Sequence, residues 1–243
     1  MFSLYKKEVQ SYFCSPFAYI ISALFLMVFS LSFINGISSM TSNTLKFSFS
    51  EVFYNNFFYF IFMIPLLTMR TFAEERRSHT ETLWLSAPIT VAQVVLAKFF
   101  AVVTVFLMMM VLSLVFPLIA WINGTVVISS LICGYLGFLL WGMVCIAIGM
   151  FCSAMTDNPI IAAVFGEAAM IVVLFLDNFT SSDLIQSLPA VAKVFSWFST
   201  EERFAGFSQG LFSIADMVFF LSFSTVVLIW TIILIEKRRW SRG

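Results

Sequence analysis

Charged residues are scarce in this sequence. Asp, Glu, Lys and Arg make up 11% of its 243 residues, against about 25% in a typical soluble domain. Hydrophobic residues make up 61%, and phenylalanine alone occurs 31 times. A water-soluble core could not bury so much apolar surface in a chain of this length. The composition therefore excludes a soluble globular protein and predicts an integral membrane protein.

The sequence also lacks the motifs of an ATPase, a metalloenzyme or a membrane hydrolase. It contains no G-x-x-x-x-G-K-[ST] loop, which cradles nucleotide phosphates in many ATPases. Its four cysteines show no metal-binding spacing, and His79 is its one histidine, so no metal site or catalytic triad is predicted. The formal net charge is zero, which gives no bulk attraction to nucleic acid. We expect no cofactor in this chain, no catalysed reaction and no nucleic-acid partner.

Long apolar runs dominate what is present. A helix that crosses a bilayer needs about 20 mostly apolar residues. Six runs fit, at Pro16–Ile34, Val52–Met69, Phe99–Ile122, Val126–Met155, Ile160–Leu176 and Met217–Ile235. Transmembrane β-barrels show short alternating segments instead of such solid runs. The sequence predicts an all-α integral membrane protein with six transmembrane helices, in a single domain over residues 1–243.

Lysine and arginine predict the orientation of these spans, because short loops rich in them stay in the cytoplasm. With the N-terminus inside, the inner segments hold Lys6, Lys7, Arg70, Arg76, Arg77, Lys98, Lys237, Arg238, Arg239 and Arg242. The outer segments hold Lys46, Lys193 and Arg203. Ten against three places both termini and the segment 70–88 in the cytoplasm.

The residues before the first run predict an amphipathic helix at the membrane surface. Over residues 1–15, apolar residues recur at helical spacing, at Phe2, Tyr5, Val9, Tyr12 and Phe13. Such a helix lies in the interface, and Pro16 separates it from the first span. The run after Pro16 is longer than the core of a signal peptide and is followed by no A-x-A site, so we expect the first span to be retained.

The most polar stretch is "TMRTFAEERRSHTETLWLSAPIT", residues 68–90. It lies between two long apolar runs and is predicted to contain a short helix that Pro88 ends. Ser86 or Thr90 is a candidate cap for a neighbouring helix. An ordinary solvated loop is the alternative interpretation.

The order of several short motifs resembles the permease subunits of type-2 ABC exporters. They are Pro65, "TMR" at 68–70, "EERR" at 74–77, "TET" at 80–82 and Pro88. Residues 153–163 and 197–223 also resemble segments of these permeases. His79 departs from the pattern, since the family often has glycine there, and glycine adopts positive φ more easily. The chain looks most like the compact six-span permeases related to gliding-motility and nitrous-oxide-reductase maturation transporters.

The resemblance implies a coupling helix over residues 70–88 that docks on a separate ATPase, which binds ATP and Mg. The implied coupling residues are Glu74, Glu75, Arg76, Arg77, Thr80, Glu81 and Leu83. It also implies that a second copy or a paralogue completes the translocation pathway in the bacterial plasma (inner) membrane. Charge pairs across the interface would set the docking register.

Glu167 lies in the middle of an apolar run. A charge at the bilayer centre costs about 3 kcal/mol on insertion scales, so this side chain is expected to face a bundle interior, a cavity or a partner. A role in the translocation pathway or in dimer gating and a purely structural polar contact both fit. Residues 177–216 are too apolar for a free loop and predict an outer re-entrant helix pair.

Two further functions remain open on the sequence alone. The chain could be a membrane scaffold that transmits ATPase motion to an extracytoplasmic partner without moving a substrate. An ion-coupled secondary transporter is a third possibility, but it needs paired intramembrane charges or inverted repeats. The sequence shows one intramembrane carboxylate and no repeat.

Overall fold

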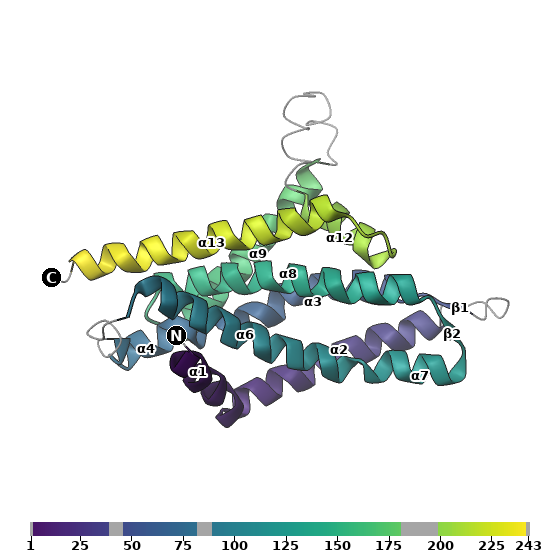
Figure 1. The fold of residues 1–243 in the computed structure, drawn as a ribbon, viewed down its shortest axis with the longest axis horizontal. Coiled ribbons are helices and arrows are strands. Elements are labelled where there is room, and N and C mark those ends of the chain that lie inside the picture. The colour runs from purple at the N-terminus through teal and green to yellow at the C-terminus, as the bar shows by residue number, and fades with distance from the viewer. Residues whose placement is uncertain (1, 39–45, 82–88, 181–198, 242–243) are drawn as a thin grey trace.

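The computed structural model describes residues 2–38, 46–81, 89–180 and 199–241, and within these ranges the chain is almost entirely helical (Figure 1). The helices are α1 (Phe2–Cys14), α2 (Pro16–Ser38), α3 (Ser50–Thr68), α4 (Arg70–Arg77), α6 (Val91–Ser113), α7 (Val115–Asn123), α8 (Ile128–Met155), α9 (Pro159–Thr180), α12 (Thr200–Ser208) and α13 (Ile214–Ser241). The strands β1 (Lys46–Phe47) and β2 (Thr125–Val126) pair in parallel.

The predicted all-α membrane class is confirmed. Among the described residues, five helices are long and apolar enough to cross a membrane, with α6 and α7 counted as one span. A shorter apolar helix, Pro159–Phe175, coincides with the fifth predicted run. The predicted helix before the first span is α1, and it ends at Cys14, immediately before Ser15 and Pro16.

The start of the third span is a correction. The helix begins at Val91 rather than Phe99, because Thr90 and Gln93 form a capping box in which each side chain bonds the other residue's backbone N–H. Lys98 was predicted to lie in the inner segment just before the third span, and the structure places it inside α6. The predicted role of Thr90 as a helix cap is confirmed.

Helix α8 forms the centre of the bundle and packs against α3, α4, α6, α9, α12 and α13. Its glycines allow close approach of neighbouring helices. A Cβ atom at Gly149 would lie 2.1 Å from Thr68 Oγ1 of α3, and one at Gly142 would lie 2.3 Å from the ring of Phe106 in α6. In lipid the hydrophobic effect does not bring helices together, so close van der Waals packing must do so. Small residues such as these glycines make that packing possible.

Phenylalanine rings fill the space between these helices. Phe60 and Phe138 meet edge to face with ring centroids 4.4 Å apart, and Phe57 stacks on Trp141 at 4.6 Å. Phe204 of α12 stacks on Phe57 at 4.8 Å. Edge-to-face and offset pairs are the favoured aromatic geometries, so the abundant phenylalanines form a continuous core that reaches from α2 to α12.

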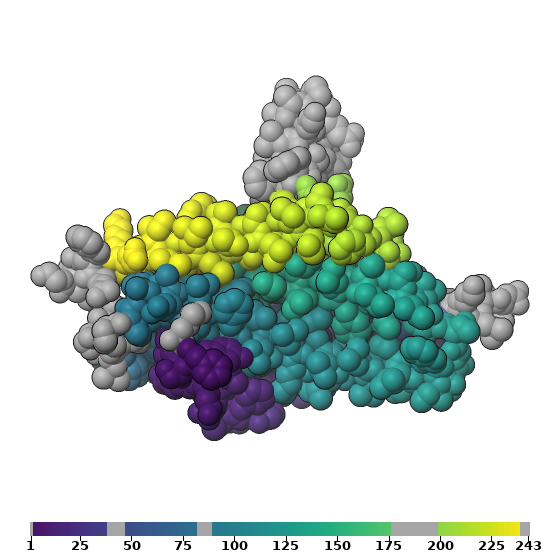
Figure 2. All heavy atoms as spheres, in the orientation of Figure 1, coloured from purple at the N-terminus to yellow at the C-terminus, as the bar shows by residue number. Residues whose placement is uncertain are grey.

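The two ends of the bundle differ. Helix α4, the start of α1 and the C-terminal end of α13 lie toward one end, while β1, β2 and the end of α7 lie at the other (Figure 1). We call the first the α4 end. Helix α1 lies on the outer surface of the bundle there (Figure 2), against α6 and the start of α2.

Candidate functional site

Helix α4 is held rigidly against α8. It follows α3 after the single residue Met69, and its first free N–H groups point at the end of α8. Phe72 N and Ala73 N both donate to Ser153 Oγ, at 3.1 and 3.2 Å, and that hydroxyl donates to the Met69 carbonyl at 2.9 Å. Orphan N–H groups at a helix start need such acceptors. A buried serine of α8 thus caps α4.

Arg76 makes a second attachment. Its side chain is 5% exposed, and its guanidinium donates to the carbonyl of Ala154 at the end of α8. It also pairs with Glu81 at 3.3 Å and with Asp157, in the α8–α9 connection, at 3.8 Å. Because a buried cation is stable only when paired and hydrogen-bonded, these contacts hold the end of α4 on α8.

Helix α13 joins the same cluster. Arg238 donates to the carbonyl of Met155 at 2.8 Å and lies 4.0 Å from Asp157. Asp157 therefore lies between two arginines, one from α4 and one from α13. Movement of α4 is linked through this cluster to α8 and α13.

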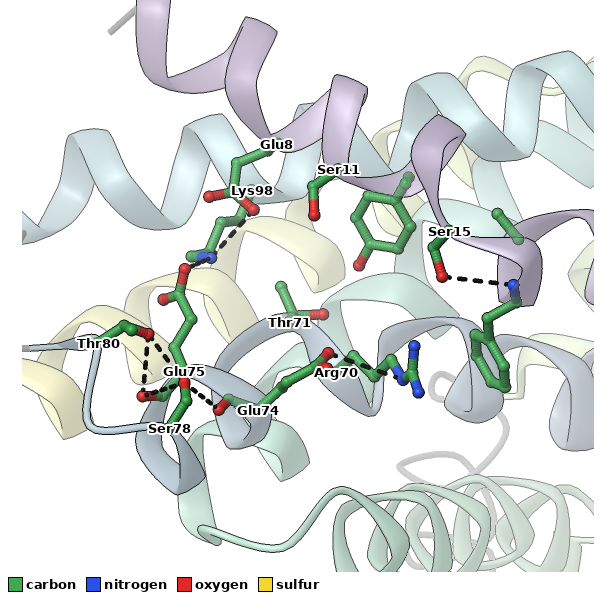
Figure 3. A pocket seen from close by; sticks show the side chains of 13 residues that line it. Glu8, Ser11, Ser15, Arg70, Thr71, Glu74, Glu75, Ser78, Thr80 and Lys98 are labelled. Atoms are coloured by element: carbon green, nitrogen blue, oxygen red, sulfur yellow. Dashed lines mark hydrogen bonds and ion pairs between the residues drawn. The ribbon is translucent and has the colours of Figure 1, made fainter.

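Lys98 connects α4 to α1. Its ammonium lies 2.9 Å from Glu75 Oε1 and 3.1 Å from Glu8 Oε2, and the side chain is 2% exposed. Figure 3 shows Lys98 between the two carboxylates. The three residues come from α6, α4 and α1, so one buried charge joins three helices. This triad was not predicted, although Lys98 is the one charge in α6, and an isolated ionisable residue in an apolar segment calls for a partner.

The turn after α4 is well ordered. His79 adopts a φ of 56°. Thr80 N donates to Glu75 O at 2.9 Å and His79 N to Arg76 O at 3.0 Å, the bonding pattern of a Schellman C-cap. His79 thus takes the positive φ usual for glycine at this position. The helix itself ends at Arg77, and residues 82–88 of the predicted coupling segment lie outside the described residues.

The predicted coupling residues divide into two groups. Glu74, Arg77 and Thr80 are exposed at the surface of the α4 end. Glu75, Arg76 and Glu81 instead turn toward the protein and make the ion pairs given above. Leu83 lies outside the described residues. The sequence analysis missed Glu8, Lys98, Ser153 and Asp157, which hold α4 in place.

Glu167 lies in α9 at the border between its buried and its exposed faces. Met170 is buried and Val164 is exposed, one helical turn to either side. The neighbouring Gly166 brings α9 close to α3, since a Cβ there would lie 2.9 Å from Pro65 Cβ. Within the described parts of the chain, Glu167 makes no hydrogen bond or ion pair. The structure thus places this carboxylate at the edge of the α3–α9 contact.

At the opposite end, α12 is one helix of the predicted outer segment. Ser199 caps it, and Tyr54 of α3 donates a hydrogen bond to Glu201. Arg203 pairs with Asp216 at the start of α13. The chain then turns at Gly210, whose φ is 89°. Residues 181–198 of the predicted outer segment lie outside the described residues.

One of three comparisons with known proteins gives a match. Residues 34–235 match the model of the family described as ABC-2 family transporter protein. The match begins near the end of α2 and extends into α13, so it covers most of the chain. No curated protein and no solved structure matches. The narrower resemblance to gliding-motility and nitrous-oxide-reductase maturation permeases stays a prediction.

Proposed function

The chain belongs to the ABC-2 transporter family, and from that premise we propose that it is the permease half of an exporter driven by a separate ATPase. The chain is a membrane permease component of an ABC transporter. The proposal adds that ATP and Mg are bound by the partner chain. It also adds that the α4 end faces the cytoplasm of a bacterial cell, with both termini on that side of the inner membrane.

The attachment of α4 is the observation that carries the proposal. A docked ATPase can move membrane spans only through a stiff element. Helix α4 continues α3 almost directly, is capped by Ser153 of α8, and is tied through Arg76 to the end of α8. A solvated loop, the alternative interpretation of this stretch, would need none of these buried contacts. A push on α4 therefore displaces α3 and α8 together.

The exposed residues of this end supply a docking face. Glu74 and Arg77 are exposed and carry opposite charges, and Thr80 follows in the hydrogen-bonded turn after α4. Charges at the rim of an interface set register and encounter rate more than affinity. We assign these three residues to contact with the ATPase, and Glu75, Arg76 and Glu81 to holding α4 in position.

A second copy fits the side of the molecule formed by α3 and α9. On α3, Glu51, Asn55, Tyr59 and Phe62 are exposed at helical spacing. Polar groups on a span rarely face lipid and usually face a bundle interior or a water-filled cavity. We propose that a second permease chain faces this stripe and that the pathway, with Glu167 at its edge, runs between the two chains.

The proposal is tested by exchanging the exposed charges of α4. The variant Glu74→Lys with Arg77→Glu keeps the net charge and the buried contacts. We expect the ATP-binding cassette protein to be absent from complexes purified through this chain and their rate of ATP hydrolysis to fall about tenfold. The reversed charges would then face like charges on the docked ATPase. Mass spectrometry and a phosphate-release assay measure both.

The matched control exchanges Glu236 and Lys237, which are exposed near the end of α13. This exchange has the same chemistry, and we expect it to leave the complex intact. If the α4 exchange variant still co-purifies with the wild-type amount of the ATP-binding cassette protein, the docking role of α4 is refuted. Equal losses in both variants would show a general charge effect instead.

A further inference from the structure

A cavity of about 300 Å³ lies between α1 and α4 (Figure 3). Its walls come from α1, the start of α2, α4 and Lys98 of α6. It lies at the α4 end, beside the surface helix α1, and is separate from the α3–α9 side proposed for the pathway. Its lining includes Glu74 and Thr80 of the proposed docking face and Glu75, which holds α4 in position, but the proposed function assigns no ligand to the cavity itself.

The lining of this cavity is negative. Three carboxylates, Glu8, Glu74 and Glu75, face two basic groups, Arg70 and Lys98, which leaves a formal charge of −1. Lys98 is already shared by two carboxylates. Arg70 lies 3.7 Å from Glu74 and stacks over the ring of Phe17. The electrostatic complement of this lining is a cation.

Two buried oxygen atoms in the lining lack hydrogen bonds within the described structure. Glu8 is 8% exposed, and its Oε1 makes only an ion pair of 3.8 Å to the exposed Lys7. The hydroxyl of Tyr12 is also buried and has no hydrogen-bond partner among the described residues, and the hydroxyl of Thr71, in the same lining, donates to the Thr68 carbonyl instead. A buried polar atom without a partner costs free energy. Glu8 Oε1 can only accept and therefore calls for a ligand that donates, and the Tyr12 hydroxyl can accept from the same ligand.

Burial also determines what Tyr12 can offer. It raises the pKa of the Tyr12 hydroxyl far above its ordinary value, so this group stays protonated at neutral pH. The hydroxyl therefore accepts through its oxygen lone pairs and adds no negative charge of its own. Glu8 and its neighbouring carboxylates carry the attraction for a cation.

We propose that this cavity binds a primary ammonium group, presented by an aminophospholipid headgroup or by a small soluble amine. The N–H groups would donate to Glu8 Oε1 and to the Tyr12 oxygen. The place of the cavity beside α1, whose Phe2 is highly exposed, suits a headgroup at the membrane surface. Both acceptors belong to α1, and the carboxylates of Glu74 and Glu75 in the same lining belong to α4, so a bound cation would attract both helices and stiffen their contact. The inference does not depend on the ATPase or on the cargo.

Lipid binding to the purified full-length chain tests the proposal. The protein in detergent is incubated with equal amounts of phosphatidylethanolamine and phosphatidylcholine. Native mass spectrometry then counts the molecules of each lipid that stay bound to it. A choline headgroup has the positive charge but no N–H donor. We therefore expect retention of phosphatidylethanolamine to exceed that of phosphatidylcholine by about tenfold, the effect of losing a charge-assisted hydrogen bond. Equal retention of the two lipids, together with no binding of ethanolamine to the wild-type chain, would overturn the proposal.

Two substitutions on neighbouring residues of α1 give the matched pair. Ser11 lines the cavity and is exposed, so Ser11→Leu fills the space without removing a charge, and we expect the tenfold preference to disappear. Gln10→Leu adds similar bulk on the opposite face of α1 and should keep it. Glu8→Gln should also abolish the preference. An unchanged preference in Ser11→Leu would refute the site.

A competition arm distinguishes the two sources of the ammonium group. If ethanolamine or putrescine at millimolar concentration displaces the lipid from wild-type protein and fails to bind Ser11→Leu, the natural ligand includes soluble amines. If neither displaces it while the lipid preference holds, the ligand is the aminophospholipid. Displacement that is identical in wild type and Ser11→Leu would count against the cavity as the binding place.

Discussion

At the scale of single residues, the strongest determinants are buried charges. Glu75 and Arg76 are adjacent in the sequence, yet each points to a different partner, Lys98 of α6 and the end of α8. Successive residues of a helix are separated by about 100°, so four charges in a row cannot all face one way. The motif predicted a charged helix, but its inward residues depend on the neighbours of α4, which no local pattern shows.

Lys98 permits a direct test of this view. Lys98→Met leaves the carboxylates of Glu8 and Glu75 facing each other without a cation. We expect the variant to lose about 3 kcal/mol of stability, because removing one partner of a buried pair leaves charge uncompensated. Thermal unfolding of the purified chain in detergent measures the loss as a lower Tm.

Two further variants test whether the uncompensated charge causes the loss of stability. Adding Glu8→Gln and Glu75→Gln to Lys98→Met removes the stranded charges, so much of the lost stability should return. Lys7→Met removes a lysine whose side chain is 67% exposed and should change the Tm little. A Lys98→Met chain as stable as wild type would mean that the triad does not hold α1 and α4 together.

At the scale of helices, the sequence predicted the presence of each helix better than the residues at which it begins and ends. Five of the six apolar runs coincide with helices long enough to cross a membrane and the sixth with a shorter apolar helix, and Thr90 was a correct cap. The start of α6 was missed because the third apolar run was taken to begin after Lys98, at Phe99, whereas the helix begins at Val91. The break at Leu114 between α6 and α7 has a cause in Pro117, which lies in the first turn of α7, where proline is tolerated, and cannot donate to Ser113 O. Only the local backbone shows how far such a break displaces the helix.

Close helix packing gives the prediction at this scale. Gly149→Ala puts a methyl group where Thr68 Oγ1 would lie 2.1 Å away, so α3 and α8 must separate. We expect a loss of about 1 to 3 kcal/mol, the range for overpacked cores, seen as a lower Tm and reduced yield of folded protein in the membrane.

Gly206→Ala is the matched control. Gly206 lies inside α12, and a Cβ there would meet nothing within 4 Å. Alanine is the better helix former, so this variant should be as stable as wild type or slightly more stable. If both alanine variants behave alike, contact between α3 and α8 at Gly149 is not limiting.

At the scale of the whole molecule, the ends of the bundle predict its topology. The α4 end holds the proposed docking face, the start of α1 and the C-terminal end of α13, and α7 ends at the other (Figure 1). After replacement of the native cysteines, Asn123→Cys at the exposed end of α7 should react with an impermeant maleimide on intact cells. Ser78→Cys, exposed after α4, should react only after permeabilisation. The reverse pattern would place α4 outside the cell and remove it from reach of an ATPase.

The exposed stripe of α3 makes the last prediction, about assembly. A charge such as Glu167 facing hydrocarbon costs about 3 kcal/mol, a cost that a second chain or a watered pathway removes. Tyr59→Cys should therefore form a disulfide-linked dimer on oxidation in membranes, since the two copies of a symmetric interface bring equivalent residues together. Ile20→Cys, on α2 and even more exposed than Tyr59, should stay monomeric. Cross-linking from Ile20→Cys but not from Tyr59→Cys would move the interface, and with it the pathway, to the α2 side of the bundle.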